Sequence, residues 1–267
     1  MGRTAVGSAI GLAMFGMKPI AEIQFMGFIY PAFDQIISHA GRMRNRTRGR
    51  FTVPLVVRAP YGGGIHAPEH HSESTEAIFA HTPGIKVVIP SNPYDAKGLL
   101  ISAIRDPDPV IFLEPKRIYR AIKEDVPDDD YTVPLGAANV IREGEHVTLV
   151  AWGAMIATCL EAVEQLSSDG IDAELIDIRT ISPLDIDTIV ESVEKTSRIV
   201  IVHEAPKTCG FGAEIVALIN EKAFLNLSAP PLRVTGFDTV MPLPKGERMY
   251  LPNAERIVAT VQQVMEY

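Results

Sequence analysis

The chain has 267 residues, a formal net charge of -8 at pH 7, 46% hydrophobic residues and 22% charged residues. This length can bury a large core and predicts two domains, on a scale of about 150 residues each. The acidic balance argues against nucleic acid as the main partner, because that binding needs a basic surface. No apolar run reaches the roughly 18 residues of a membrane span. Cys159 and Cys209 lie in no CxxC pattern and indicate a reducing compartment, which is the cytoplasm, or the mitochondrial matrix of a eukaryote.

Strand-like and helix-like patterns alternate through the first half of the chain. Residues 4–16 predict a helix, and residues 19–25 a buried strand that carries the polar pair Glu22 and Gln24. Such a pair is usually either a satisfied core group or part of a site. Helical spacing then predicts one long helix over 28–43. Further strands are predicted at 53–59, 85–90 and 109–115, and further helices at 73–81 and 92–106.

The arginine-rich segment RMRNRTRGR, residues 42–50, follows the predicted long helix. By itself this run suits contact with phosphate or nucleic acid. The acidity of the whole chain and the lack of interleaved aromatic residues favour another interpretation. The arginines then complement a helix C-terminus or contact another subunit.

The segment AIKEDVPDDDYTVP, residues 121–134, is acidic, contains prolines and lacks periodicity. These properties predict an interdomain linker. The run Asp128–Asp130 is interpreted as solvated charge, because no partner ligand stands at a set spacing from it. We therefore expect a first domain at 1–122, a linker at 123–136 and a second domain at 137–267.

The second half repeats the alternation. Continuous Val and Ile runs that alternate with helices predict parallel sheets covered on both faces. The fold class expected is therefore α/β, with two parallel-sheet domains. The predicted strands are 147–152, 171–178, 198–204 and 231–236, and the predicted helices are 155–166, 183–195, 211–224 and 253–266.

A glycine–histidine loop, YGGGIHAPEHHSES at residues 61–74, follows the strand predicted at 53–59. The three glycines at 62–64 let the backbone approach a ligand and adopt positive φ. Three histidines follow, His66, His70 and His71, and histidine is the residue type whose unperturbed side chain changes charge near neutral pH. A glycine loop at the carboxyl end of a strand is where α/β folds place their sites. A surface loop in which histidines cluster by chance is the alternative.

Seven blocks of the sequence together resemble one family from end to end. The blocks are AEIQFMGFIYPAFDQI, RAPYGGGIHAPEHHSES, KVVIPSNPYDAKGLL, VIFLEPKRIY, VTLVAWG, DIRTISPLD and HEAPKTCGFGAEI. They are similar to the beta subunit of a thiamine-diphosphate-dependent 2-oxo acid dehydrogenase. The resemblance implies a transketolase-type pyrimidine-binding domain followed by a transketolase C-terminal domain.

The resemblance also implies partners and a reaction. A separate alpha subunit would hold the diphosphate of thiamine diphosphate with its magnesium, while this chain would surround the aminopyrimidine. The chain has no GDG followed by paired asparagines, which agrees with that division. The implied reaction is oxidative decarboxylation of a 2-oxo acid, with the acyl group passed to a lipoyl arm on an acyltransferase core. The implied assembly contains a second beta subunit.

Site residues follow from the matching motifs. His71 matches the active-site histidine of the family and precedes Ser72–Ser74. Its neutral imidazole can accept or donate a proton, and a structural histidine is the alternative. Phe28 falls where the family places an aromatic ring against the pyrimidine. An ordinary core phenylalanine is the alternative. His70 stands where the family usually has tyrosine. The remaining residues assigned to the cofactor pocket are Gln24, Tyr61 and His66, the last as support.

Four residues match a potassium site of some family members. They are Leu55 and Ala103, through their carbonyl oxygens, and Asp106 and Asp108, through their carboxylates. Hard oxygen ligands suit such an ion. The chain departs from the pattern in two ways, since Asp108 stands where asparagine is common and Val56 replaces a ligand with a hydroxyl group.

The resemblance raises two further expectations. Family members carry a longer N-terminal segment with a glutamate that hydrogen-bonds the aminopyrimidine, and the matching position here is Gly2. The chain is therefore expected to be truncated, or to be an assembly subunit that docks the acyltransferase core without turnover. The segments HEAP, residues 203–206, and RVTGFDTVMP, residues 233–242, favour branched-chain 2-oxo acids as substrates. Pyruvate and acetoin are the alternatives.

Overall fold

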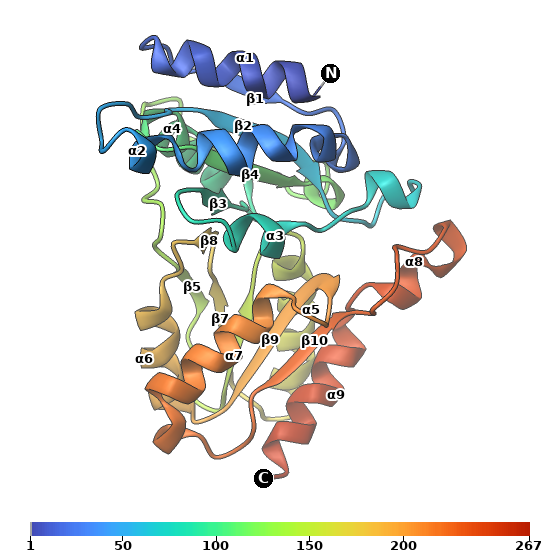
Figure 1. The fold of residues 1–267 in the computed structure, drawn as a ribbon. Helices are drawn as coiled ribbons and strands as arrows, with labels where there is room; N and C mark the ends of the chain where they lie inside the picture. Colours follow the sequence, from blue (N-terminus) through green and yellow to red (C-terminus); the bar gives the residue numbers. More distant parts are fainter. Residues whose placement is uncertain (1) are drawn as a thin grey trace.

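Runs of β-branched residues form two separate sheets, and these define two α/β units that lie one above the other, with the chain termini at opposite ends (Figure 1). The computed structural model describes residues 2–267. None of the helices in this range is both long and apolar enough to cross a membrane.

The first sheet has five strands in the order β1-β2-β4-β3-β8. Four of them run parallel, and β8 pairs antiparallel with β3. The strands are β1 (Ile20–Glu22), β2 (Val56–Tyr61), β3 (Lys86–Val88), β4 (Val110–Pro115) and β8 (Thr180–Ser182). The helices of this unit are α1 (Gly2–Met14), η1 (Met26–Ala32), η2 (Gln35–Ala40), α2 (Met43–Arg46), η3 (Glu69–His71), α3 (Glu76–Ala80), α4 (Pro93–Arg105) and η4 (Lys116–Ile118).

The second sheet has the order β10-β9-β6-β7-β5, with β5 antiparallel at its edge. Its strands are β5 (Asn139–Arg142), β6 (Val147–Ala151), β7 (Ala173–Asp177), β9 (Ile199–Pro206) and β10 (Leu232–Gly236). Its helices are α5 (Met155–Ser168), α6 (Ile186–Thr196), α7 (Phe211–Lys222), η5 (Phe224–Asn226), α8 (Pro244–Tyr250) and α9 (Ala254–Met265).

The predicted α/β fold is confirmed, and each sheet has one antiparallel edge strand that the sequence did not reveal. The edge strand β8 comes from beyond the predicted linker, yet it pairs with β3 of the first sheet, at Val87 with Ser182 and Val88 with Thr180. The hydrogen bonds of the first sheet therefore extend beyond the expected limits of the first domain. Those limits, 1–122, stay a prediction. A three-residue strand leaves no periodic signal in a sequence.

The single long helix predicted over 28–43 is wrong. The segment forms the 3₁₀ helix η1, the π-helix η2 and the short helix α2 in succession. Pro31 lies inside η1. Because proline has no N–H and its ring crowds the preceding turn, a regular α-helix cannot continue through this position. The apolar spacing correctly places Ile29, Ala32 and Ile36 in the core.

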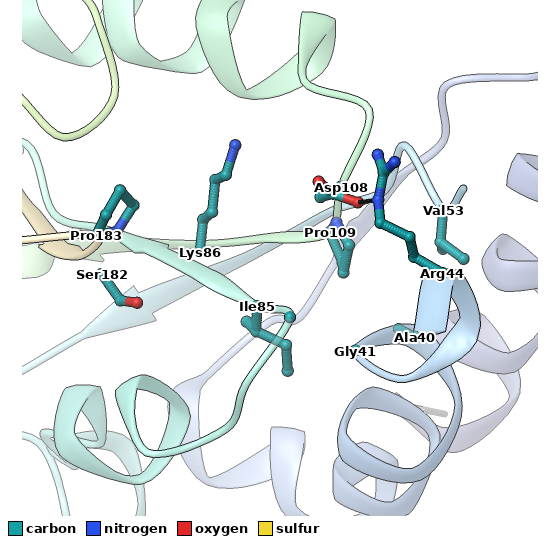
Figure 2. A pocket seen from close by; sticks show the side chains of 11 residues that line it. Ala40, Gly41, Arg44, Val53, Ile85, Lys86, Asp108, Pro109, Ser182 and Pro183 are labelled. Atoms are coloured by element: carbon teal, nitrogen blue, oxygen red, sulfur yellow. Dashed lines mark hydrogen bonds and ion pairs between the residues drawn. The ribbon is translucent and has the colours of Figure 1, made fainter. Parts of the chain in front are cut away.

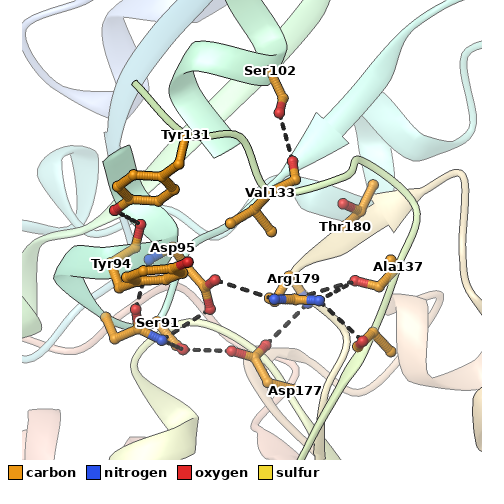
Figure 3. Close-up of polar contacts among 12 residues, drawn as sticks. Ser91, Tyr94, Asp95, Ser102, Tyr131, Val133, Ala137, Asp177, Arg179 and Thr180 are labelled. Carbon is orange, nitrogen blue, oxygen red and sulfur yellow. Dashed lines mark hydrogen bonds and ion pairs between the residues drawn. The ribbon is translucent and has the colours of Figure 1, made fainter. Parts of the chain in front are cut away.

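The predicted linker contains no helix or strand between Ile118 and Asn139, and it is held against α4. The Tyr131 ring stacks on Tyr94 at 4.5 Å between centroids. The Ser102 hydroxyl donates a hydrogen bond to the Val133 carbonyl oxygen at 2.5 Å. Figure 3 shows these contacts beside a second group around Arg179.

Arg179, which follows β7, ties the end of the linker to the first unit (Figure 3). Its guanidinium donates to the carbonyl oxygens of Ala137 at 2.9 Å and Ala138 at 3.0 Å, and to Asp95 Oδ1 at 3.1 Å. Hydrogen bonds of this charge-assisted kind are stronger than neutral ones. The junction between the units is therefore fixed by polar contacts on this side.

One continuous apolar core also joins the two units. Leu113 of β4 belongs to it, together with Val150 of β6 and Ile201 of β9. Trp152 lies directly after β6, is 2% exposed and stacks on the His203 ring at 5.2 Å. The junction between the units is therefore part of the core. Burial of apolar surface, the dominant favourable contribution to folding, stabilises it.

Candidate active site

The glycine–histidine loop begins where β2 ends and packs against the second unit. Gly62 has φ of 76° and Gly64 has φ of 88°, values that side chains rarely allow. A Cβ atom on Gly62 would overlap the carboxylate of Glu204 from β9. The loop therefore needs glycine here both for its backbone conformation and for its close approach to β9.

Four rings form an aromatic–imidazole cluster that consists of Phe25, Phe28, His70 and His71. The Phe25 and His71 ring centroids are 4.1 Å apart. Those of Phe28 lie 5.1 Å from His70 and 5.9 Å from His71. Phe28 is 41% exposed, while both histidines are half-buried. The cluster thus presents an aromatic ring and two imidazoles at a surface that a partner can cover.

The close packing of η1 against η3 produces this cluster. A Cβ atom on Gly27 would overlap the His70 ring, so glycine is what lets the two segments approach. The Tyr30 hydroxyl donates to Glu73 Oε2 at 2.7 Å and connects η1 to the end of the loop. Burial and the Glu73 carboxylate raise the pKa of Tyr30 above its usual value, which keeps the hydroxyl protonated as a donor.

The structure brings some of the predicted site residues together and separates others. Phe28 and His71 belong to the cluster, and Gln24 is exposed beside Phe25. His66 lies away from the cluster rings, and its Nδ1 atom is 3.0 Å from Glu247 Oε2. Tyr61 is 1% exposed, so its ring supports the loop from inside and does not line an open pocket. Burial raises the pKa of the Tyr61 hydroxyl well above its usual value.

Lys116 belongs to the candidate site, although no sequence motif indicates it. It lies immediately after β4, is 7% exposed, and its Nζ atom donates a hydrogen bond to the carbonyl oxygen of His71. Burial lowers the pKa of Lys116 to about 8, against the opposing influence of Glu204 and Glu247. The only signal in the sequence was a lysine directly after an apolar strand.

Two buried carboxyl groups next to the loop were also missed. Glu76 of α3 is 0% exposed and Glu204 of β9 is 3% exposed. Burial, followed by the neighbouring Glu76, raises the pKa of Glu204 to about 7, and burial raises the pKa of Glu76. The Ser74 hydroxyl donates to Glu204 Oε1 at 3.4 Å. The HEAP segment thus contributes to the buried junction behind the loop.

The residues matched to a potassium site are engaged by other groups. Arg44 Nε donates to Asp108 Oδ1 at 2.6 Å, as Figure 2 shows. Lys86 Nζ donates to Asp106 Oδ2 at 2.5 Å.

The two backbone oxygens of that expected site also have donors. The Leu55 carbonyl accepts from Val110 N at 2.9 Å and the Ala103 carbonyl from Asp106 N at 3.3 Å. With both carboxylates already neutralised by side-chain cations, this arrangement does not fit a potassium ion. Residues 2–267 contain no cluster of three or more His, Cys, Asp or Glu side chains with the geometry of a metal site.

Comparison with known proteins accounts for nearly the whole chain. Residues 3–122 match the transketolase pyrimidine-binding domain, and residues 136–257 match the transketolase C-terminal domain. The chain is 54% identical over 259 residues to the pyruvate dehydrogenase E1 component subunit beta of Acholeplasma laidlawii, covering 97% of this chain and 79% of that protein. The chain belongs to the beta subunits of thiamine-diphosphate-dependent 2-oxo acid dehydrogenases.

Further relatives of this beta subunit support the same family and the same fold. The subunit of the same name from Bacillus subtilis strain 168 is 51% identical over 261 residues, which cover 98% of this chain and 80% of the relative. Among solved structures, a split-gene transketolase described as an inactive beta4 tetramer has a TM-score of 0.82 at 24% identity, covering 100% of this chain and 82% of that chain. A Pichia stipitis transketolase mutant has a TM-score of 0.71 at 14% identity, covering 99% of this chain and 37% of that chain. These two likenesses show the fold.

Proposed function

We propose that this beta subunit acts with an alpha subunit in the oxidative decarboxylation of pyruvate and the transfer of the acetyl group to a lipoyl arm. The aromatic–imidazole cluster carries the proposal, because it combines an open aromatic face with imidazole groups that can donate or accept a proton. The names of the relatives support pyruvate. They favour this alternative over the branched-chain substrates that two sequence segments suggested.

The cluster fits thiamine diphosphate as a cofactor. The exposed ring of Phe28 offers an apolar face for a flat heteroaromatic ring, and His70 and His71 lie next to it. Phe28 and Gln24 would hold the aminopyrimidine from this chain, while the alpha subunit would hold the diphosphate and its magnesium. When bound, the cofactor supplies the electron sink for decarboxylation.

The chain's own residues orient one proton-transfer group. The Lys116 ammonium holds the backbone of His71, and the Phe25 ring at 4.1 Å restricts how the imidazole can turn. An imidazole held in this way can donate or accept a proton at a ring nitrogen as the acyl group moves to the lipoyl sulfur. Positioning of this kind contributes to catalysis by reducing the reorganisation needed at the moment of reaction.

The proposed assembly places this surface against other subunits. An alpha subunit would cover the cluster, a second beta subunit would complete the assembly, and a lipoyl-bearing acyltransferase core would receive the acetyl group. Phe28 and Tyr30, both about two-fifths exposed, support a covered surface here.

The test is a comparison of substrates. The chain is co-produced with its cognate alpha subunit, and decarboxylation of pyruvate and of 3-methyl-2-oxobutanoate is measured with thiamine diphosphate and an artificial electron acceptor. We expect a higher kcat/KM for pyruvate. A preference for the branched-chain substrate would overturn the assignment of pyruvate. Normal assembly without turnover of either substrate would support a subunit that serves assembly alone.

A further inference from the structure

A carboxylate from the second unit holds the glycine–histidine loop of the first. Glu247 lies on α8 and is 2% exposed. Its Oε1 atom accepts a hydrogen bond from Gly64 N at 2.7 Å, and its Oε2 atom accepts one from His66 N at 2.9 Å. Oε2 also lies 3.0 Å from His66 Nδ1. In Figure 1, α8 extends from the second unit toward the segment between β2 and α3.

The backbone of the loop needs such a partner. His66 has φ of 59° and Gly64 has φ of 88°. Non-glycine residues rarely adopt a backbone conformation with positive φ, and they keep it only where the surrounding structure fixes it. One carboxylate that accepts two backbone N–H groups makes two charge-assisted hydrogen bonds. Glu247 therefore acts at the point of the loop where the backbone conformation is least favourable.

A second contact holds the other end of the loop. Lys116 donates to the carbonyl oxygen of His71, and its charge is attracted by both Glu204 and Glu247. The loop is thus fixed at Gly64 and His66 from α8, and at His71 from the end of β4. Between these contacts the chain forms the short helix η3, which carries both cluster histidines.

We propose that Glu247 is a positioning residue, which fixes the glycine–histidine loop and thereby sets the place of the His71 imidazole against Phe25 and Phe28. Glu247 lies outside the aromatic–imidazole cluster and acts through the backbone of the loop. The consequence for turnover rests on the proposed function, whereas the restraint on the loop is a property of the chain itself.

The experiment compares Glu247→Gln with the wild type and with Glu255→Gln, a matched control at an exposed position on the neighbouring helix α9. Glutamine keeps the size of the side chain but offers one acceptor where the carboxylate offers two. All three chains are assembled with the alpha subunit. Amide hydrogen exchange over residues 62–71 is measured together with kcat and KM for pyruvate.

We expect Glu247→Gln to speed exchange over residues 62–71 about tenfold or more. We expect kcat to fall by up to about 10²-fold while KM stays within about twofold, because a displaced catalytic group affects the chemical step. Glu255→Gln should match the wild type in every measurement. If Glu247→Gln does not fold, Glu247→Asp, which retracts the carboxylate by one methylene, should show the same changes in a smaller degree.

Two outcomes separate this proposal from the proposed function. Unchanged exchange over residues 62–71 and unchanged kcat in Glu247→Gln, with an active wild type, would overturn the positioning role and leave the function standing. Faster loop exchange in Glu247→Gln, with a wild type that does not turn over pyruvate, would support the restraint on the loop and contradict the function.

Discussion

The rings of Phe25 and His71 lie 4.1 Å apart at an interplanar angle of 56°. Phe25 directly precedes η1 and His71 ends η3, two segments that are distant in sequence, and Gly27 lets these segments approach. The contact brings the His71 imidazole next to an aromatic surface, where burial and packing restrict its orientation.

Gly62→Ala should destabilise the chain through a steric clash with Glu204. The new Cβ atom would overlap the Glu204 carboxylate and would also occupy φ of 76°. The control is Gly170→Ala, where φ is 78° and no atom lies within 4 Å of the new Cβ, so that only the backbone cost applies. We expect Gly62→Ala to lose about 1 to 3 kcal/mol more than the control. Urea unfolding of both variants measures the difference, and equal losses would contradict the predicted contact.

Glu204→Gln should change how stability depends on pH. The folded chain raises the pKa of Glu204 from 4.5 to about 7, mainly through burial. Its contribution to stability is therefore fully present below the unfolded value near 4.5 and is lost as pH rises through about 7. The loss corresponds to about 3 kcal/mol at most.

The measurement for Glu204 is urea unfolding at pH 5 and pH 8. Relative to Glu204→Gln, the wild type should lose stability between these two pH values. The surface variant Glu161→Gln, which changes an exposed carboxylate on α5, should follow the wild type. A wild type and a Glu204→Gln chain with the same pH dependence would show that Glu204 titrates normally.

Lys116→Met should remove a pH dependence of stability that is opposite in sign to that of Glu204 and occurs at higher pH. Burial lowers the pKa of Lys116 from 10.5 to about 8, so between these values the unfolded chain holds a proton that the folded chain releases. The wild type should therefore gain stability relative to Lys116→Met as pH rises from about 8 toward 10.5. Denaturant midpoints at three pH values in this window test it. A difference between the two chains that does not vary with pH would contradict the shift.

Much of the fold could be predicted from periodicity alone. Continuous Val and Ile runs marked β2, β4, β6 and β9, because buried parallel strands have apolar side chains on both faces. The short elements β8 and α8 were not predicted, because they have too few residues to show a periodic pattern of apolar side chains. The helix predicted across Pro31 failed because apolar spacing describes which side chains are buried and does not show whether the backbone hydrogen bonds can form.

The candidate site could be located from the sequence only where its residues lie close together along the chain. Three glycines followed by histidines marked the loop, and a family motif marked His71. Lys116, Glu204 and Glu247 gave no such signal, because each is a single charged residue whose role depends on a partner far away in the chain. Glu247 and Gly64, for example, are 183 residues apart. Such contacts follow only from the packing of the two units against each other.

The most direct test of the central claim is His71→Ala in the assembly with the alpha subunit, measured as acetyl transfer from pyruvate to a lipoyl domain. The control is His81→Ala, an exposed histidine after α3. General acid–base catalysis contributes about 10²- to 10⁴-fold, so we predict a fall of that size for His71→Ala and none for the control. Acetyl transfer at the wild-type rate by His71→Ala would contradict the claim that this imidazole faces the reacting groups.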